Sequence, residues 1–441
     1  PMDDHMLVTA VGLPAGATST TFIGSFELES GQTIRDVVIG YTAYGTINEA
    51  GDNAVIVGHS LTSNSNVAEW WGAILGDGPG FGLDTSSDFV VCANYLGSPY
   101  GSSSPVTPDP GKASTEGGAG AGVYAADFPT PVTVRDNVRL QRMLLDRLGV
   151  THLRMAIGGS MGSMLALEWA ACYPEYVEEM VLIAGCGRHT DWAIGIGEAQ
   201  RFSIMTDAKF CGGAYDLADP PRAGLATSRM MAMLSYRAPA SVAERFSRSV
   251  MNETGGGGSG ASVGGDGEDG EGGGGGRGGG GMPMRMRKPS SHADLGACVA
   301  HANEQVQSLP YFAVESYLQY QGKKFIQRFD ANCYIQLTYT LDSHDVARGR
   351  GEYVDVLRGL RHRAMVVGIT SDVLYPYELQ TELARHMPNA QLYAIDSPHG
   401  HDAFLIEIKQ LNDAIVRFRR GEPVDAAAAA AAAGAVTAAA A

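Results

Sequence analysis

Residues 158–162 of the sequence read Gly-Gly-Ser-Met-Gly, and this spacing is suited to nucleophilic chemistry. A short apolar run at 155–157 predicts a strand before the turn, and residues 163–172 predict a helix after it. A serine in such a tight turn is held in a strained conformation that exposes its hydroxyl, while small neighbours let strand and helix approach closely. We therefore predict that Ser160 is a nucleophile and that the Met161 N–H faces the oxyanion formed when Ser160 attacks a carbonyl.

A serine nucleophile needs a base, and the base needs an acidic group that orients it. In sites of this type the chain order is serine, then acid, then histidine. Asp372 follows a predicted strand at 364–369 and His401 follows one at 391–395, so both reach the sheet edge that carries Ser160. We predict that His401 accepts the Ser160 proton and that Asp372 orients the imidazole and stabilises its cationic form.

Other residues near these positions offer alternatives. His399 is a rival base, and the run His-Gly-His-Asp at 399–402 raises the question of a metal site. No second set of His or Cys stands at ligand spacing, so we predict no metal. The second oxyanion donor is expected in the loop after an early strand, and we assign it to the Leu61 N–H. His59 in the same loop is interpreted as structural.

The elements that must position these groups alternate between strand and helix patterns. Continuous apolar runs predict strands at 55–57, 89–93, 154–157, 180–184, 364–369 and 391–395. Helical spacing predicts helices at 135–148, 164–172, 377–386 and 407–419. Buried strands separated by helices indicate a mostly parallel sheet with helices on both faces. Together with the nucleophile turn, this predicts an α/β-hydrolase fold.

The alternation stops in the middle of the chain, which predicts a division into parts. We expect a first part of the α/β core at 20–187, an inserted helical cap at 188–359 and a second part of the core at 360–420. A Gly-rich stretch at about 252–292 lacks the apolar residues needed to offset its ordering entropy, so we predict a disordered insertion within the cap. Residues 421–441 form a low-complexity, Ala-rich tail.

Composition narrows the class of protein. The 441 residues carry a formal net charge of -16, which argues against binding to nucleic acid and to anionic membranes. Six cysteines without a Cys-x-x-Cys pair favour small buried thiols in a reducing compartment over zinc or disulfides. No apolar run is long enough to span a bilayer, and residues 1–20 lack a signal-peptide pattern. We expect a cytoplasmic location; because the chain begins with Pro, an upstream targeting segment is left open.

Several motifs resemble those of homoserine O-acetyltransferases. They are collinear and extend over residues 22–420 apart from the Gly-rich insertion, so they are more specific than any single motif. The form Leu-Gly-Ser-Pro-Tyr-Gly at 96–101 is similar to the fungal-type branch of that family. Besides the Gly-Gly-Ser-Met-Gly turn, the matching motifs are Ala-Leu-Glu-Trp at 166–169, His-Ser-Leu-Thr at 59–62, Asn-Tyr-Leu-Gly at 94–97, Tyr-Gly-Ser at 100–102, Phe-Pro at 128–129, Thr-Val-Arg-Asp at 133–136, Glu-Ala-Gln-Arg at 198–201, Tyr-Gln-Gly-Lys at 320–323, Arg-Phe-Asp-Ala-Asn at 328–332 and Gly-His-Asp-Ala-Phe-Leu at 400–405.

The resemblance implies an acyltransferase of methionine biosynthesis that moves an acetyl group to the hydroxyl of L-homoserine through an acyl-enzyme. Acetyl-CoA is then a co-substrate, with no permanently bound cofactor. The resemblance implies Ser160, Asp372 and His401 as the catalytic triad. It also implies that Arg201 pairs with the substrate α-carboxylate and that Asp402 meets the substrate ammonium; without it they would be a helix-surface arginine and a helix N-cap. A homodimer through the cap helices is expected on the same ground.

Two departures and several alternatives remain. Ser163 and Phe202 differ from the residues common in the family, and Phe202 is expected to reshape the acceptor pocket. Relatives in the fungal-type branch acylate serine or deacetylcephalosporin C, so serine is an alternative acceptor, and succinyl is an alternative acyl group. An esterase or thioesterase with the same triad is a second reading. A non-enzymatic scaffold is a third, against which the intact set of Ser160, Asp372 and His401 argues.

Overall fold

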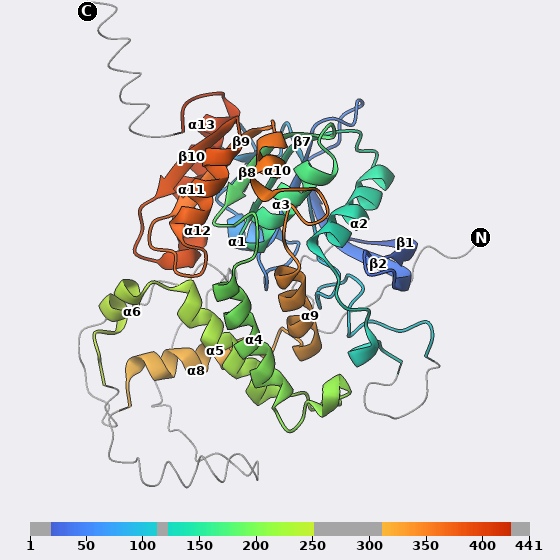
Figure 1. Ribbon diagram of the computed structural model, residues 1–441, viewed down its shortest axis with the longest axis vertical. Helices are drawn as coiled ribbons and strands as arrows, with labels where there is room; N and C mark the ends of the chain where they lie inside the picture. Colours follow the sequence, from blue (N-terminus) through green and yellow to red (C-terminus); the bar gives the residue numbers. More distant parts are fainter. Residues whose placement is uncertain (1–18, 113–121, 251–310, 425–441) are drawn as a thin grey trace, which may run out of the picture.

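The computed structural model describes residues 19–112, 122–250 and 311–424 (Figure 1). The predicted disordered insertion at about 252–292 lies outside the described residues, as does the Ala-rich tail from residue 425 onward.

An eight-stranded sheet forms the centre of the molecule, with the strand order β1-β2-β6-β3-β7-β8-β9-β10. Strands β6, β3, β7, β8, β9 and β10 run parallel to one another, whereas β1 and β2 form an antiparallel edge of the sheet. The prediction of a mostly parallel sheet is confirmed. The strands are β1 (Ser19–Glu27), β2 (Thr33–Tyr44), β3 (Ala54–Gly58), β6 (Phe89–Ala93), β7 (Leu153–Gly159), β8 (Val177–Ile183), β9 (Arg363–Ile369) and β10 (Ala390–Ile395), and a separate small pair is β4 (Leu75–Gly76) with β5 (Leu83–Asp84).

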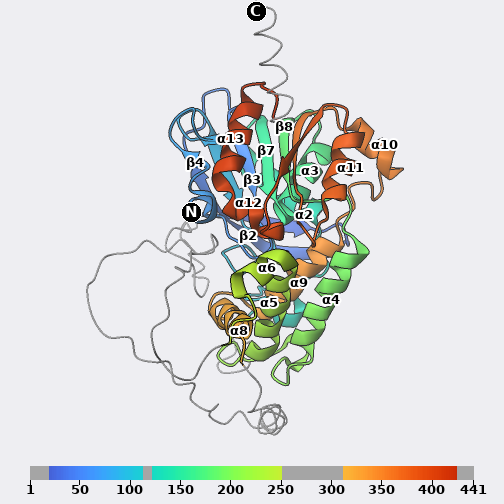
Figure 2. The ribbon, with the colours of Figure 1, turned by 90° about the vertical axis from the view of Figure 1, so that its left-hand side faces the viewer.

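Helices cover both faces of this sheet (Figure 2). One buried apolar cluster joins the sheet to α2 (Val134–Arg147), α3 (Met161–Cys172), α10 (Tyr353–Gly359) and α11 (Tyr377–His386). A second cluster joins the opposite face to α1 (Val67–Trp71), α12 (Ala403–Ile406) and α13 (Ile408–Arg419). Because every residue of β3 and β6 is buried, the central strands are apolar throughout rather than alternating.

A layer of helices lies beyond the carboxyl ends of the parallel strands (Figure 1). We call these helices the cap; all of them fall between residues 188 and 359, the range predicted for it. They are α4 (Asp191–Met205), α5 (Arg222–Tyr236), α6 (Pro239–Phe246), α8 (Ala313–Phe325) and α9 (Ala331–Asp342), and the short 3-10 helices of the described chain are η1 (Ala125–Asp127), η2 (Cys211–Gly213) and η3 (Gly400–Asp402).

The chain enters and leaves the cap through two adjacent segments. The His189 N–H donates to the His344 carbonyl oxygen at 2.9 Å, and Val346 N–H donates to Gly187 O at 3.0 Å. Arg188 and Asp345 form an isolated β-bridge between these bonds. The two crossings are therefore fastened together at the base of the cap.

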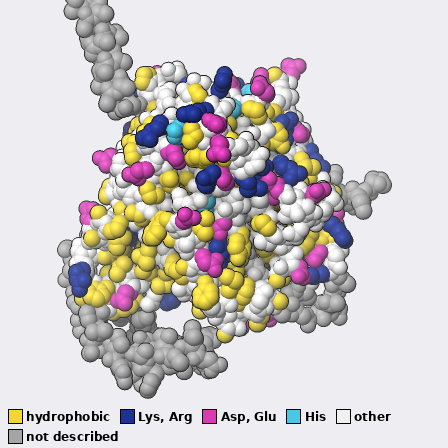
Figure 3. Space-filling view, viewed as in Figure 1, with side chains coloured by type: hydrophobic (Ala, Val, Ile, Leu, Met, Phe, Trp, Pro, Cys, Tyr) yellow, Lys and Arg dark blue, Asp and Glu magenta, His cyan; other side chains and the backbone are white. Residues whose placement is uncertain are grey.

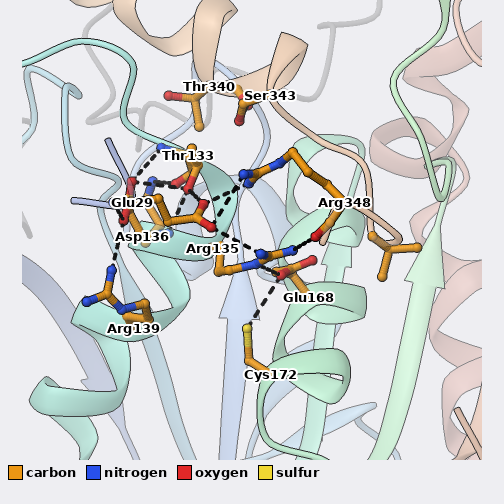
Figure 4. Close-up of polar contacts among 12 residues, drawn as sticks. Glu29, Thr133, Arg135, Asp136, Arg139, Glu168, Cys172, Thr340, Ser343 and Arg348 are labelled. Atoms are coloured by element: carbon orange, nitrogen blue, oxygen red, sulfur yellow. Dashed lines mark hydrogen bonds and ion pairs between the residues drawn. The ribbon is translucent and has the colours of Figure 1, made fainter. Parts of the chain in front are cut away.

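A cluster of paired charges joins the segment after β1 to α2 and α3 (Figure 4). Arg135 on α2 contacts Glu168 on α3 at 2.6 Å and Glu29, which follows β1, at 3.0 Å. Arg348 reaches Glu29 at 2.7 Å and Arg350 reaches Glu168 at 2.6 Å. Burial alone would raise the pKa of Glu29, but hydrogen bonds from Arg348 and Thr133 hold that pKa below its usual range. Glu168 is buried, and it is paired with both Arg135 and Arg350, as a buried ion must be to be tolerated.

Candidate active site

Ser160 occupies the turn between β7 and α3 in a backbone conformation that a non-glycine residue rarely adopts, with φ of 57° and ψ of -121°. Close packing of glycines surrounds it. A Cβ on Gly162 would lie 1.9 Å from the Gly58 carbonyl oxygen, and one on Gly158 would lie 2.3 Å from that of Gly162. The glycines of the motif are therefore required for α3 to approach β3 and β7, as the sequence predicted.

His401 and Asp372 form a buried pair at the same edge of the sheet. His401 lies in η3 after β10, and its Nδ1 is 2.7 Å from Asp372 Oδ2. The other carboxylate oxygen of Asp372 accepts backbone N–H bonds from Leu374 at 2.8 Å and Tyr375 at 2.9 Å. The imidazole that meets Asp372 thus belongs to His401 and not to the rival His399, which is half-buried two residues earlier.

The loop after β3 carries the predicted second oxyanion donor, and several contacts fix it. Leu61 is 8% exposed. Tyr95 donates its hydroxyl to the His59 carbonyl oxygen at 2.7 Å, and Arg328 donates to the Thr62 carbonyl oxygen at 2.8 Å. Burial lowers the pKa of His59 to about 4, so this histidine is neutral near pH 7, in line with a structural role. Met161 is the first residue of α3, where backbone N–H groups have no partner within the helix.

Two connected hollows meet at Ser160, and both are lined by Leu61, Ser160 and Tyr236. The first, which we call the His401 side, is also lined by His401 and Asp402, with Thr62 and Phe404 among its other walls. The second, which we call the His189 side, runs under the cap. Its polar lining is formed by His189, Gln200, Ser235, Thr338, Asp342 and Tyr375. The site therefore lies between the core and the cap.

The two predicted substrate-binding residues differ in their surroundings. Asp402 lines the His401 side and is 3.0 Å from Arg237 of the cap region. Arg201 on α4 is 3% exposed, and its guanidinium is 2.8 Å from Asp342 and 2.9 Å from Glu198. Asp342 lines the His189 side, whereas Arg201 lies behind it.

Sequence reasoning missed several polar groups of this site. Arg229 on α5 is buried, its guanidinium is 3.4 Å from the Thr62 hydroxyl, and it lies 5.9 Å from the ring of Tyr236. His189 and Asp342 are neighbours in the wall of the His189 side, with His189 Nδ1 3.3 Å from Asp342 Oδ1. None of these residues belongs to a recognisable catalytic or binding motif, so no local sequence pattern could have identified them.

The structure also shows where Ser163 and Phe202, the two residues that differ from those common in the family, are located. Ser163 is buried in α3 and packs against the backbone of Gly185. Phe202 is 62% exposed on the outside of α4, so the expectation that it reshapes the acceptor pocket is wrong. Helical position explains this result, because Phe202 is adjacent to Arg201 in sequence and projects from a different face of α4.

Comparison with known proteins identifies the family. A sequence model of the alpha/beta hydrolase fold matches residues 53–269. A homoserine O-acetyltransferase of Salinibacter ruber is 44% identical over 406 residues, which cover 91% of this chain and 97% of that protein. The homoserine O-acetyltransferase of Saccharomyces cerevisiae is 42% identical over 418 residues, covering 89% of this chain and 84% of that protein. The chain belongs to the homoserine O-acetyltransferase family.

Solved structures agree with the fold of this family member. The homoserine O-acetyltransferase from Bacillus anthracis has a TM-score of 0.70 at 21% identity, covering 91% of this chain and 96% of that one. Esterase E22 has a TM-score of 0.68 at 21% identity, covering 91% of this chain and 98% of that one. At such identities the likeness shows the fold alone, and the predicted α/β-hydrolase fold is confirmed.

The described part of this family member lacks membrane-spanning helices and groups of metal-ligating side chains. No helix within residues 19–112, 122–250 and 311–424 has both the length and the apolar character needed to cross a membrane. Over the same residues, no three His, Cys, Asp or Glu side chains gather in a way that could hold a metal ion.

Proposed function

We propose that this protein transfers an acetyl group from acetyl-CoA to the side-chain hydroxyl of L-homoserine by double displacement. The observation that carries the proposal is the buried contact of 2.7 Å between His401 Nδ1 and Asp372 Oδ2, in a hollow whose wall includes the strained Ser160. Family membership supports homoserine as the acceptor and acetyl as the acyl group. Acetyl-CoA acts as a co-substrate, and no bound cofactor is required.

In the first half-reaction Ser160 Oγ attacks the thioester carbonyl and gives its proton to His401 Nε2. Asp372 stabilises the imidazolium that forms. The N–H groups of Leu61 and Met161 hold the oxyanion; loss of one such donor typically costs on the order of a hundred-fold in rate. The carbon–sulfur bond then breaks, the thiolate of CoA takes the proton from His401, and Ser160 carries the acetyl group.

In the second half-reaction the homoserine hydroxyl attacks the acetyl-Ser160 ester while His401 takes its proton. The bond to Ser160 Oγ breaks, that oxygen recovers the proton, and O-acetylhomoserine leaves. Because thiol and hydroxyl both exchange a proton with His401, both must reach the His401 side of the hollow. The cap covers the sheet edge and helps to exclude water, which a transferase needs in order not to hydrolyse its acyl-enzyme.

The proposed acceptor site uses one acid and one buried arginine. Asp402, which lines the His401 side, meets the substrate ammonium. Arg201 is the predicted partner of the α-carboxylate, but two carboxylates already pair with its guanidinium. Arg229 is a second candidate because it is buried beside Thr62, which lines the same hollow. Arg201→Lys and Arg229→Lys distinguish them, since the variant at the true carboxylate site raises the KM for homoserine and leaves the KM for acetyl-CoA unchanged.

The predicted homodimer and cytoplasmic location remain predictions. Apolar side chains gather on the surface of the cap in the view of Figure 3. Four large exposed residues of the cap are Trp192 and Phe202 on α4, Leu234 on α5 and Tyr320 on α8. We propose that cap helices pair in a homodimer, and sedimentation of the purified chain tests this directly.

The decisive experiment follows thiol release from acetyl-CoA with homoserine, with serine and without acceptor. We expect homoserine to accelerate release strongly and Ser160→Ala to abolish it. Faster release with serine would assign serine as the acceptor. Equal release with and without acceptor would make the protein a thioesterase, and release from succinyl-CoA above that from acetyl-CoA would change the donor.

A further inference from the structure

A second histidine–aspartate pair lies in the wall of the same site. His189 Nδ1 is 3.3 Å from Asp342 Oδ1, and His189 is 7% exposed. Both residues line the His189 side together with Ser160. The mechanism above gives this pair no role, although a buried imidazole beside a carboxylate is costly unless its polar atoms are used.

The outer end of this pair is anchored in the cap. Asp342 is the last residue of α9, and its other oxygen is 2.8 Å from a guanidinium nitrogen of Arg201 on α4. The same guanidinium lies 4.3 Å from the ring of Tyr339. Asp342 is therefore held between two cap helices and cannot follow the core independently of them.

The inner end of the pair reaches the catalytic residues of the core. His189 Nε2 is 3.1 Å from the Tyr375 hydroxyl. The Tyr375 N–H donates to Asp372 Oδ1 at 2.9 Å, and the Tyr375 ring stands edge to face with His401 at 5.3 Å between centroids. Tyr375 thus touches both members of the proposed catalytic pair, and its hydroxyl is bonded to His189.

His189 lies at the junction between the core and the cap, so it can connect the two directly. His189 lies immediately before the N-cap of α4, where the chain passes from the core into the cap, and its N–H is bonded to His344 O. Asp372 lies in the turn between β9 and α11. The cap reaches this turn at Tyr375 through His189, and also at Val373, whose carbonyl oxygen accepts from Trp192 Nε1–H of α4 at 2.9 Å.

We propose that His189 is a positioning residue for the Asp372–His401 pair, acting through the Tyr375 hydroxyl. Asp342, paired with Arg201, lies 3.3 Å from the His189 imidazole on the cap side. His189 is hydrogen-bonded to the Tyr375 hydroxyl, and the Tyr375 N–H keeps the Asp372 carboxylate in the plane that His401 requires. This inference rests on the proposed roles of Asp372 and His401. A misplacement of catalytic groups by about 1 Å can cost on the order of a hundred-fold in rate, so a chain of this kind acts on kcat.

The first test is Tyr375→Phe, which removes one oxygen and keeps both the ring and the N–H bond to Asp372. We expect kcat to fall on the order of ten-fold, with the KM for acetyl-CoA and for homoserine within about two-fold of wild type. Tyr176→Phe is the matched control, because Tyr176 is also buried and donates a single bond, to Val150 O at 3.1 Å, away from both hollows. Unchanged kcat in Tyr375→Phe, or a rise in KM alone, overturns the inference.

The second test changes His189 itself. His189→Leu should lower kcat as much as Tyr375→Phe does, and His189→Gln, whose amide can meet the Tyr375 hydroxyl, should restore part of the loss. The double variant His189→Leu with Tyr375→Phe should be no slower than either single variant, because both remove the same hydrogen bond. Losses that multiply in the double variant, or no rescue by Gln, would contradict the proposal.

A third readout separates failure of this inference from failure of the proposed function. Hydrolysis of p-nitrophenyl acetate reports acylation of Ser160 without any amino-acid acceptor. If wild type shows no homoserine-dependent thiol release but Tyr375→Phe and His189→Leu still slow ester hydrolysis equally, the proposed acceptor is wrong and the positioning role stands. If wild type transfers acetyl to homoserine and both variants match it in both assays, the positioning role is wrong and the proposed function stands.

Discussion

Among the described residues, the pairs His401–Asp372 and His189–Asp342 border one site, and they differ in how the carboxylate is held. In His401–Asp372 the second carboxylate oxygen accepts neutral backbone N–H groups of its own turn. In His189–Asp342 the second oxygen meets the cationic guanidinium of Arg201. The first carboxylate keeps its full charge for the imidazole, whereas much of the second is already compensated.

The two imidazoles also differ in what lies at the nitrogen that does not face the aspartate. His401 borders a hollow with Ser160, whose strained turn exposes a hydroxyl that can be activated. His189 ends on Tyr375, and burial raises the pKa of that phenol well above its usual value, so it stays neutral. On our proposals, the same two residue types therefore perform chemistry in one pair and positioning in the other, and what each nitrogen of the imidazole contacts decides between these roles.

The largest expected effect comes from removing Ser160, the proposed nucleophile, which lines both hollows. Ser160→Ala should lower acetyl transfer by about 10³-fold or more, since loss of one triad member disables the whole unit. Thiol release from acetyl-CoA and mass spectrometry of the trapped acetyl-enzyme measure this. Activity within a few-fold of wild type would mean that His401–Asp372 serves a different nucleophile.

The next test makes the same isosteric change in both pairs. Asp372→Asn should lower kcat by about 10³- to 10⁴-fold, because the imidazole loses its tautomer and the charge that stabilises it. Asp342→Asn should cost about ten-fold or less, because Arg201 already neutralises much of that charge. Each variant is the control for the other. An equal fall in kcat in both variants would contradict the assignment of one pair to catalysis and the other to positioning.

A smaller effect concerns histidines that are buried without a carboxylate partner. Burial lowers the pKa of both His59 and His344 to about 4, from an ordinary value near 6.5. Below pH 6.5 the unfolded chain binds protons that the folded chain refuses, so their contribution to stability is complete above pH 6.5 and is lost as pH falls toward 4. Thermal unfolding between pH 7.5 and 5 should show a declining Tm.

The variant His344→Gln checks the origin of that decline. The His344 Nε2–H donates to the Cys186 carbonyl oxygen at 3.0 Å, and the amide of Gln can also donate there but does not titrate. The variant should therefore show a shallower fall in Tm with acid than wild type. Parallel curves for the two proteins would assign the acid sensitivity to other groups.

The smallest effect is expected from deletion of residues 254–281. If the cap acts on the site through Asp342 and His189, removal of this Gly-rich stretch should leave kcat within about two-fold of wild type. Steady-state thiol release measures this, with circular dichroism as the check on folding. A folded deletion variant without activity would show that the stretch contributes to turnover.

Sequence patterns predicted the parallel core well because its signals are local. The helix predicted at 377–386 coincides with α11 (Tyr377–His386), and the predicted strands correspond to β3, β6, β7, β8, β9 and β10 with small shifts at their ends. The antiparallel strands β1 and β2 were not predicted. β1 is largely exposed along its length and its pairing is interrupted by register shifts, so its apolar residues form no clear period.

The candidate site likewise contains residues that local sequence patterns could identify and contacts that only the tertiary fold creates. Ser160, Asp372 and His401 follow strand ends, and a strand end is visible in sequence. The contact between His189 and Tyr375 joins residues 186 positions apart, and no local spacing encodes it. Arg201 was assigned from a motif to the substrate, and its pairing with Asp342 could not be foreseen, because Asp342 reaches it only after α9 packs on α4. The pair with Glu198 lies within the motif itself, three residues apart on one helix.

The segments by which the chain enters and leaves the cap are joined at Arg188 and Asp345, and this affects how such enzymes can diversify. An insertion whose first and last residues are neighbours in space disturbs the host sheet no more than a short turn would. The part of the gene that encodes the cap can then change, lengthen or be exchanged while the register of β8 against β9 is kept. The cap can in this way vary in sequence and length while the strand ends that carry Ser160, Asp372 and His401 keep their positions.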